Sequence, residues 1–417
     1  MCPGHGHVPG DASAGTGSPS NTGPGDSEPF PWEIGAFDAH CHPTTTPASI
    51  AQISKMRTRA ITVMASRAQD QALSAIAADD HGVPTRLQLK SRSADPSAPG
   101  GRVVPAFGYH PWFSHLVYDD SASSELDKAA HFASVLKPSP DSDPDFLASL
   151  PDPEPLSSVV AAAKERLLRY PTAMVGEVGL DKAFRLPQPR ETGPDGEIDP
   201  PAEEERDMVP GGRYGRMLSK YRVNLPHQER ILLAQVALAG ELGRAVSVHG
   251  VQCSGLLLEA LSKTWKGHER EVVSRRKQRL VAKDAQAWEE YDSDEEVEPQ
   301  QTQVGAKPFP PRICLHSFSG SAEVLKQYMD PRIPSKIFFS FSVAINMGTP
   351  SVEEKVPEII RTCPDDRILV ETDLHLAGNE MDSMLEKMYR HVCRIKGWGL
   401  KEGMERIARN YEDFVFG

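Results

Sequence analysis

Eight short apolar runs recur along the chain, and their length suits strands better than helices. Val, Ile, Phe and Ala fill them in near-continuous blocks, as expected for strands buried on both faces of a sheet. The predicted strands are residues 35–41, 59–65, 102–108, 173–179, 244–249, 312–316, 336–343 and 367–372. Helical patterns lie between several of them, at 156–170, 225–242, 321–328 and 352–362, with a closing helix near 401–410. This alternation indicates an α/β fold, a parallel sheet closed into a (β/α)8 TIM barrel.

The 417 residues exceed what one barrel needs. Residues 1–30 are rich in Gly, Pro and Ser, and we expect them to form a disordered tail because they cannot bury enough apolar surface. Four further stretches are longer than ordinary connections: 82–101, 114–155, 186–222 and 264–310. Without them and the tail, roughly 240 residues remain, close to the about 250 typical of one barrel. The sequence therefore predicts a single TIM-barrel domain at 31–417 with four insertions.

The place of each insertion predicts which end of the barrel it decorates. Segments 114–155 and 186–222 directly follow strands, so we expect them at the catalytic end, where they would narrow or cover the active site. Segments 82–101 and 264–310 follow helices and are expected at the opposite end. The last insertion has seven acidic residues between Glu289 and Glu298. It is interpreted as a solvated loop, with a docking or phosphorylation loop around Ser293 as the alternative.

Composition limits the cellular setting and the binding partners. The formal net charge of −12 argues against broad nucleic-acid binding through a basic surface, although a local phosphate site is compatible with it. No apolar stretch approaches the roughly 20 residues that cross a bilayer, so no membrane association is expected. The six cysteines form no C-x-x-C pair, which favours a reducing compartment, the cytoplasm, the nucleus or both.

Histidines and carboxylates, the residue types that bind divalent metals, lie at or near the ends of five predicted strands. The first strand ends in Asp38-Ala39-His40-Cys41-His42, and Glu177 lies within the fourth. His249, His316 and Asp373 end the fifth, sixth and eighth strands. Taken singly, the glutamate could pair with a buried arginine and either later histidine could be a satisfied core residue. Taken together, imidazoles and carboxylates at one rim of a barrel predict a catalytic divalent-metal centre.

The ligand types predict the chemistry of this centre. One ion would take His40, His42 and Asp373, a second would take His249 and His316, and Glu177 would bridge them with a water. Asp373 is also placed to accept the proton of the attacking water, so Glu177 and Asp373 are the expected catalytic carboxylates. Mixed ligation favours Zn or Mn over Mg, although carboxylate-rich sites also accept Mg. Such a centre hydrolyses esters or amides.

The order of these motifs resembles the TatD family of metal-dependent hydrolases and deoxyribonucleases, within the amidohydrolase superfamily. The matching motifs are D-x-H-x-H, Gly108-Tyr109-His110-Pro111, G-E-x-G-L-D, His249, H-S-F-S-G and E-T-D, and they span Phe37 to Asp373. The large insertions resemble a fungal-type branch. The resemblance implies a TIM barrel and makes His40, His42, Glu177, His249, His316 and Asp373 the metal ligands. It also places His110 and the turn containing Ser317 and Ser319 near a substrate phosphate, and Arg185 is a looser candidate for the same role.

Three functions follow from these observations. The leading one is a metal-dependent hydrolase that cleaves phosphodiester bonds of DNA in an exonuclease-like manner. Two positions depart from the family pattern, Gly250-Val251 after His249 and Leu374-His375 after Asp373. Both flank the expected substrate, which keeps a non-nucleic-acid ester or amide as a second possibility. The third is an interaction protein that uses its insertions, because some members of this branch are partners of a helical-repeat subunit of a cell-cycle ubiquitin ligase.

Overall fold

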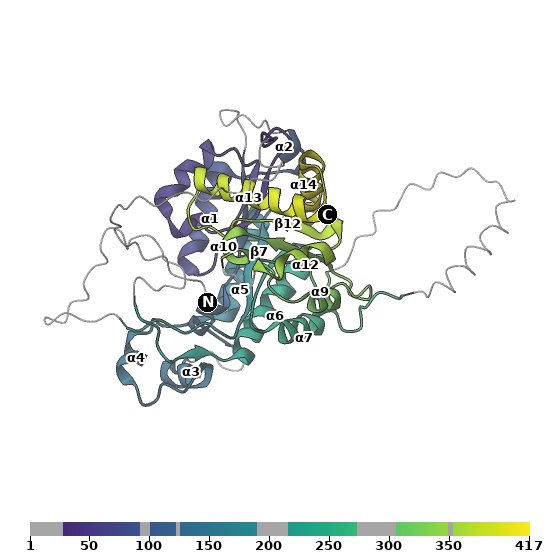
Figure 1. Cartoon of the computed structure of the whole chain (residues 1–417). Coiled ribbons are helices and arrows are strands. Elements are labelled where there is room, and N and C mark those ends of the chain that lie inside the picture. The colour runs from purple at the N-terminus through teal and green to yellow at the C-terminus, as the bar shows by residue number, and fades with distance from the viewer. Residues whose placement is uncertain (1–27, 92–100, 122–125, 190–215, 273–305, 349–352) are drawn as a thin grey trace, which may run out of the picture.

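Eight parallel strands form the centre of the molecule (Figure 1). The computed structural model describes residues 28–91, 101–121, 126–189, 216–272, 306–348 and 353–417. In sheet order the strands are β1 (Phe37–Cys41), β2 (Ala60–Met64), β3 (Val103–Phe107), β7 (Met174–Asp181), β9 (Val246–Val251), β10 (Arg312–Leu315), β11 (Lys336–Phe341) and β12 (Ile368–Val370). Beyond the end of β12, the amide of Asp373 donates to the His40 carbonyl at 3.0 Å and the His42 amide donates to the Leu374 carbonyl at 2.8 Å. These bonds join the last strand to the first, and the predicted TIM barrel is confirmed.

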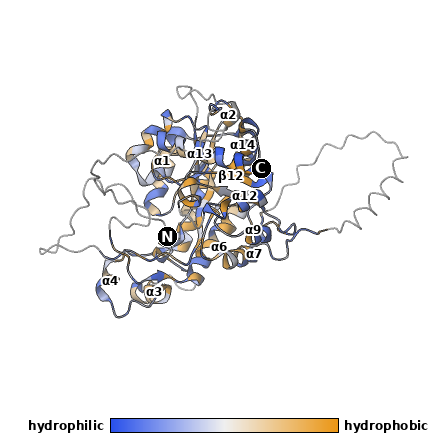
Figure 2. Cartoon of the chain, in the orientation of Figure 1, coloured by the Kyte–Doolittle hydropathy of each residue, from blue (hydrophilic) through white to orange (hydrophobic). Residues whose placement is uncertain are grey.

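Each predicted strand is present, with ends that shift by only a few residues. The reason is visible in their burial, because β1, β2, β3 and β7 are buried at every position. Apolar side chains fill most positions on both faces of such strands, so the sequence signal is strong. Figure 2 shows that apolar residues follow the interior elements, whereas polar residues are frequent on the surrounding helices.

Helices surround the barrel, and five of them agree with the predicted patterns. These five are α5 (Leu156–Arg169), α6 (Leu225–Glu241), α9 (Ala322–Tyr328), α12 (Val356–Thr362) and α14 (Leu400–Phe416). The prediction omits α1 (Ala68–His81), α7 (Ser254–Trp265) and α13 (Asn379–Lys396). Helix α1 has few large apolar residues, so the helical spacing of apolar positions is weak in its sequence. Helix α13 buries Met381, Leu385, Met388 and Val392, a helical spacing that is present in the sequence although the prediction does not use it.

Short elements complete the described part of the chain. Near the N-terminal half they are η1 (Pro43–Thr45), η2 (Pro47–Lys55), α2 (Arg86–Ser91) and η3 (Pro111–Leu116). Towards the C-terminus they are α10 (Val343–Asn346) and η6 (Asp365–Arg367). No helix of the described residues is both long and apolar enough to span a lipid bilayer.

The insertions after β3 and β7 pack together into one unit, which we call the insertion lobe. It comprises the described residues of 114–155 and 186–223, with α3 (Lys128–Val135), α4 (Pro144–Ser149) and the short strands β4 (Val117–Tyr118), β5 (Leu136–Lys137), β6 (Glu154–Pro155) and β8 (Arg222–Val223). Strand β5 of the first insertion pairs antiparallel with β8 of the second. Phe132, Leu136, Phe146 and Tyr221 form its buried core. In Figure 1, α3 and α4 lie at the lower left, set apart from the helices of the barrel.

The C-terminal helix closes the opposite end of the barrel. Tyr411 and Phe414 of α14 are at most 1% exposed. They pack in a buried cluster to which seven of the eight barrel strands contribute residues, and Ala245, just before β9, contributes for the eighth. This cluster is therefore the interior of the barrel. The Tyr411 ring stacks on Phe37 with centroids 4.8 Å apart, and its hydroxyl lies 2.8 Å from the Thr62 hydroxyl. Arg312, the first residue of β10, donates to the Phe414 carbonyl. The barrel is therefore sealed at the N-terminal ends of its strands and open at the other.

The N-terminal boundary differs in one respect from the expected tail. Phe30, which the sequence assigns to that tail, is 8% exposed and packs edge-on against Trp32 and Tyr389. Burial of two aromatic rings offsets the cost of ordering this segment, so the chain joins the core before residue 31. Residues 1–27 of the predicted tail and the whole acidic stretch from Glu289 to Glu298, with Ser293, lie outside the described residues.

Candidate metal centre

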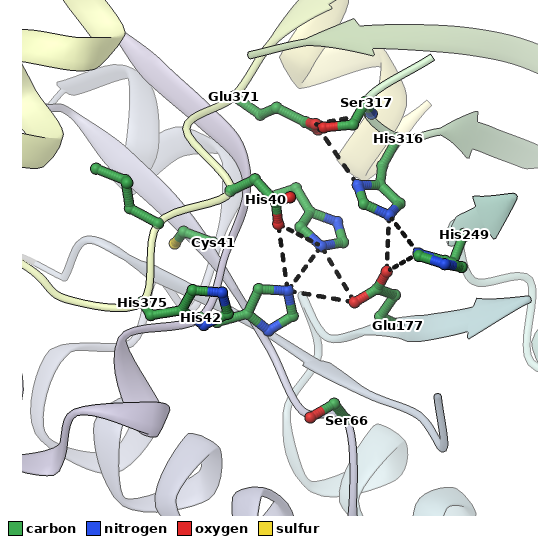
Figure 3. A network of polar contacts seen from close by, with 12 residues as sticks. His40, Cys41, His42, Ser66, Glu177, His249, His316, Ser317, Glu371 and His375 are labelled. Carbon is green, nitrogen blue, oxygen red and sulfur yellow. Dashed lines mark hydrogen bonds and ion pairs between the residues drawn. The ribbon is translucent and has the colours of Figure 1, made fainter. Parts of the chain in front are cut away.

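Six residues predicted from the sequence meet at the open end of the barrel (Figure 3). His40 belongs to β1 and His42 follows it, Glu177 lies in β7, and His249 lies in β9. His316 comes directly after β10, and Asp373 lies three residues after the end of β12. The Asp373 side chain is 14% exposed, while the other five are at most 9% exposed. Parallel strands bring their carboxyl ends to one rim, which is why residues separated by more than 300 positions can converge.

The Glu177 carboxylate lies between two groups of imidazoles. Its Oε2 atom is 3.4 Å from His40 Nε2 and 3.2 Å from His42 Nε2. Its Oε1 atom is 2.9 Å from His249 Nδ1 and 2.7 Å from His316 Nε2. Asp373 Oδ1 closes the first group, 3.7 Å from His40 Nε2 and 3.5 Å from His42 Nε2. One oxygen of the glutamate therefore faces each group, as expected for a bridging ligand.

The chemistry of the donor set fits divalent metal ions. His40 Nε2 and His42 Nε2 are 3.1 Å apart, and His249 Nδ1 and His316 Nε2 are 3.2 Å apart. Nitrogens bound at about 2.0–2.1 Å to one tetrahedral ion lie roughly 3.3 Å from each other, so these spacings suit shared cations. Without a cation, lone pairs of nitrogens and carboxylate oxygens would face each other in a buried space, which is costly unless protons intervene. The groups His40, His42, Asp373 and His40, Glu177, His316 are thus both able to hold an ion.

A second layer of polar groups fixes the orientation of these rings. Ser247 Oγ lies 2.9 Å from His40 Nδ1, and Asp181 Oδ2 lies 3.2 Å from His249 Nε2. Glu371 Oε1 is 3.5 Å from His316 Nδ1, on the side away from the cluster. The ring of His375 stacks beside His42 at 5.2 Å and its Nδ1 meets Thr45 Oγ1 at 3.0 Å. Contacts of this kind select the ring nitrogen that faces a metal.

Asp38 has a structural task between β1 and the end of β12. Its carboxylate accepts hydrogen bonds from the Thr372 hydroxyl at 2.5 Å, the Thr372 amide at 3.0 Å and the His40 amide at 3.1 Å. Burial raises the pKa of Asp38 to about 8, although these hydrogen bonds oppose the rise. Asp38 therefore ties His40 to the segment that carries Asp373.

Carboxylates and imidazoles shift each other's proton affinity strongly. Burial would raise the pKa of Glu177, but the surrounding His110, His316 and His40 rings outweigh it and hold that pKa well below its usual range. Burial would lower the pKa of His42, but hydrogen bonds to Asp373 and Glu177 raise it to about 10. The same balance raises the pKa values of His249 and His316. In the metal-free protein, protons thus occupy part of the cluster at neutral pH.

Metal binding is therefore expected to release protons. Because the pKa of His42 is raised to about 10, its proton is retained at pH 7 and a metal ion must displace it. The raised pKa values of His249 and His316 favour their protonated forms in the same direction. We expect the affinity for Zn or Mn to rise with pH between about 6 and 8, roughly tenfold per pH unit for each proton released. Calorimetric titrations at one pH in two buffers of different ionisation enthalpy measure the number released. Identical heats in both buffers would contradict this prediction.

The residues expected to contact substrate occupy several environments. His110 lies inside the cluster, where its Nε2 is 3.2 Å from Glu177 Oε1. The Trp112 amide donates to its Nδ1, so the ring proton lies on Nε2 and points at the glutamate. Ser317 is 8% exposed and donates from both its amide and its hydroxyl to Glu371 Oε1, so it faces the second layer. Ser319 and Arg185 are exposed, beyond the ends of β10 and β7.

Sequence reasoning gave no role to two residues of the second layer. Ser247 is a small polar residue within an apolar strand, and this contrast is the signal that could have identified it. Glu371 is completely buried in the E-T-D motif, two residues before Asp373. The sequence signal is an acidic residue that directly follows an apolar strand, because burying such a residue is costly unless it has a polar partner. For His375 the sequence offered only a lone loop histidine. Its contact with His42 depends on closure of the barrel between β12 and β1.

Comparison with known proteins identifies the family. The model of the family described as "TatD related DNase" matches residues 37–415. The chain is 34% identical over 383 residues to Cut9-interacting protein scn1 of Schizosaccharomyces pombe, covering 91% of this chain and 98% of that protein. It is 26% identical over 327 residues to an uncharacterized deoxyribonuclease of Saccharomyces cerevisiae, covering 75% of this chain and 82% of the relative.

Among solved structures, the TatD homolog YJJV of Escherichia coli aligns with a TM-score of 0.47 at 15% identity, covering 91% of this chain and 96% of the other. The family match spans the whole barrel and every motif at its open rim. The chain belongs to the TatD-related DNase family of metal-dependent hydrolases.

Proposed function

We propose that the chain is a divalent-metal-dependent deoxyribonuclease that cleaves phosphodiester bonds in an exonuclease-like manner. The observation that carries this proposal is the Glu177 carboxylate, whose two oxygens each face a separate group of imidazoles. His40, His42 and Asp373 would hold one ion, and His249 and His316 would hold the other. When bound, such ions lower the pKa of water and neutralise charge that develops on phosphoryl oxygens. Mg, Mn and Zn are the candidate metals.

Asp373 is assigned the role of proton acceptor for the attacking water. Its side chain is the most exposed of the six, so it borders the space that substrate must enter. Its backbone is in the left-handed region at a φ of 56°, three residues after the end of β12, and its side chain lies against His40 and His42. Burial would raise its pKa, but the neighbouring histidines hold that pKa well below its usual range. The carboxylate is thus ionised at neutral pH, which is the form required to bind a cation or to act as a base.

The substrate's phosphates would meet residues at the rim rather than a basic surface. The net charge of −12 gives no general attraction for DNA, so affinity must come from the metal centre and its neighbours. Arg185 and Ser319 are exposed beyond the ends of β7 and β10 and are assigned to phosphate contact. The insertion lobe, whose first segment begins within η3 a few residues after His110, is assigned the role of narrowing this entrance.

The test is nucleotide release from single-stranded DNA with added Mg, Mn or Zn. We expect activity that a chelator abolishes, and an Asp373→Ala variant that is at least about 100-fold slower, the low end of a general-base contribution. Glu358→Ala serves as the control for a lost carboxylate, because Glu358 is an exposed residue of α12. Equal release by wild type and Asp373→Ala would remove the assignment. Activity only on carboxylic esters or amides in a parallel panel would replace DNA by those substrates.

A second function is suggested by one relative. The S. pombe relative is named for an interaction with Cut9, and this chain covers 98% of that relative. We therefore propose that the chain also binds a Cut9-like protein through its insertions. Pull-downs with full-length protein, a 264–310 deletion and Asp373→Ala test this. Capture that survives Asp373→Ala but is lost on deletion supports docking independent of catalysis, whereas undiminished capture by the deletion variant excludes that insertion as the docking site.

A further inference from the structure

Asp181 is a buried aspartate at the end of β7 that receives hydrogen-bond donors from four directions. Its Oδ1 accepts the backbone amides of Ala183 at 2.7 Å and Phe184 at 2.9 Å. Its Oδ2 accepts Trp112 Nε1 at 2.6 Å and lies 3.2 Å from His249 Nε2. Both oxygens are therefore fully used, and the carboxylate has a single orientation.

This arrangement decides which nitrogen of His249 faces the metal centre. An ionised carboxylate only accepts hydrogen bonds, so the His249 nitrogen that faces Asp181 must carry a proton. That nitrogen is Nε2, so Nδ1 is the nitrogen left to bind a cation when one is shared with Glu177 and His316. The Nδ1 atom points at Glu177 Oε1, 2.9 Å away, and at His316 Nε2, 3.2 Å away. Asp181 thus sets both the tautomer and the direction of the ring.

The position of Asp181 is in turn fixed by α6 and by the insertion lobe. The Gln228 side chain, 3% exposed, accepts the Asp181 amide at 2.7 Å and donates to its carbonyl at 3.0 Å. The ring of Trp112 stacks on Phe184 with centroids 4.8 Å apart and planes inclined by 14°. Phe184, which lies just before the second insertion, packs into the buried core of the insertion lobe. A continuous set of contacts therefore runs from this lobe through Trp112 and Asp181 to His249.

We infer that Asp181 is a positioning residue for the ion held by His249 and His316, and that the insertion lobe supports it through Trp112 and Phe184. The inference rests on the proposed metal centre, but not on DNA being the substrate. The inference predicts that binding of the ion at His249 and His316 depends on the insertion lobe, whereas binding of the other ion does not. The ion at His40, His42 and Asp373 is supported by Asp38 of β1, which binds Thr372 after β12, and by Ser247 of β9, and none of these residues belongs to the lobe.

Asp181→Asn is the informative substitution because it keeps the size of the side chain. Asparagine has one acceptor oxygen, whereas four donors point at this position. If that oxygen stays with the Ala183 and Phe184 amides, the side-chain NH₂ faces His249 and drives the ring proton to Nδ1. The metal-facing nitrogen then carries a hydrogen. Trp112→Phe removes only the indole N–H and keeps the ring on Phe184.

The experiment measures Zn affinity by chelator competition and the ring ¹⁵N shifts of His249 in the Zn-loaded protein. For Asp181→Asn we expect one of two ions to bind about 10- to 100-fold more weakly while the other is unchanged. Trp112→Phe should show a smaller loss at the same ion. Asp382→Asn is the matched control, because Asp382 is also a buried aspartate that accepts the backbone amides of Arg57 and Thr58, far from the cluster. Trp398→Phe controls for loss of an indole.

The outcomes separate this inference from the proposed function. Selective weakening of one ion, with a His249 ring that is protonated at Nε2 in wild type and altered in Asp181→Asn, supports it. Wild-type affinity for both ions in Asp181→Asn and Trp112→Phe overturns it. If Asp181→Asn does not fold, Trp112→Phe alone decides, and unchanged affinity there overturns the inference. Metal binding without cleavage of DNA would refute the nuclease assignment and leave these results valid.

Discussion

Glu177→Gln should abolish hydrolysis more completely than any other single substitution in this chain. The change keeps the shape of the side chain but replaces one carboxylate oxygen with an NH₂ group that cannot bind a cation. Each oxygen of Glu177 faces one group of imidazoles, so the variant loses a ligand to one ion and the negative charge shared by both. We expect a loss of about 10,000-fold in rate, roughly 5.4 kcal/mol at about 1.36 kcal/mol per decade.

Metal analysis and kinetics test this expectation together. Elemental analysis of Glu177→Gln after dialysis should find fewer ions per chain than in wild type, and excess Mn should not restore the rate. The control is Glu154→Gln, an exposed glutamate of the insertion lobe whose replacement should leave metal content and rate unchanged. Full metal content combined with a near wild-type rate would exclude a bridging role for Glu177.

Phe414→Ala should cause the largest loss of stability. The Phe414 ring is completely buried against Phe338, with centroids 5.4 Å apart, where α14 seals the barrel. Removing a buried phenylalanine costs about 3–5 kcal/mol, since the surrounding structure relaxes only partly around the cavity. Against a typical total stability of about 5–15 kcal/mol, this is a large fraction. The loss arises far from the metal centre, at the opposite end of the strands.

Urea denaturation followed by circular dichroism measures this effect. Phe416→Ala is the matched control, because that ring lies two residues away and is only partly buried. We expect its unfolding midpoint to change much less. If both variants unfold at the wild-type midpoint, the C-terminal helix does not seal the barrel as described. Metal affinity measured below the unfolding transition should be unchanged in both variants.

The strands and the candidate metal ligands were readable from the sequence because each has a strong local signal. Apolar blocks such as 59–65 and 102–108 have no stable alternative to burial, and the structure places β2 and β3 inside them. A histidine or carboxylate at the end of such a block is costly unless partnered, so His249, His316 and Glu177 are conspicuous before any coordinates are known. Parallel strands end at one rim, and this rule alone brings six such residues together.

The tertiary structure decided everything that depends on contacts between distant segments. Nothing local to 136–137 or 222–223 predicts that they pair, and only their packing joins two insertions into one lobe. The roles of Asp181, Glu371 and His375 follow from the atoms opposite them, which lie on other strands or loops. The pattern of apolar and polar residues shows whether a segment is buried or exposed to solvent. It therefore predicts the strands of the barrel and the polar residues at their ends that are candidate ligands. Which ring nitrogen faces an ion depends on the three-dimensional neighbours of each side chain, which only the closed barrel specifies.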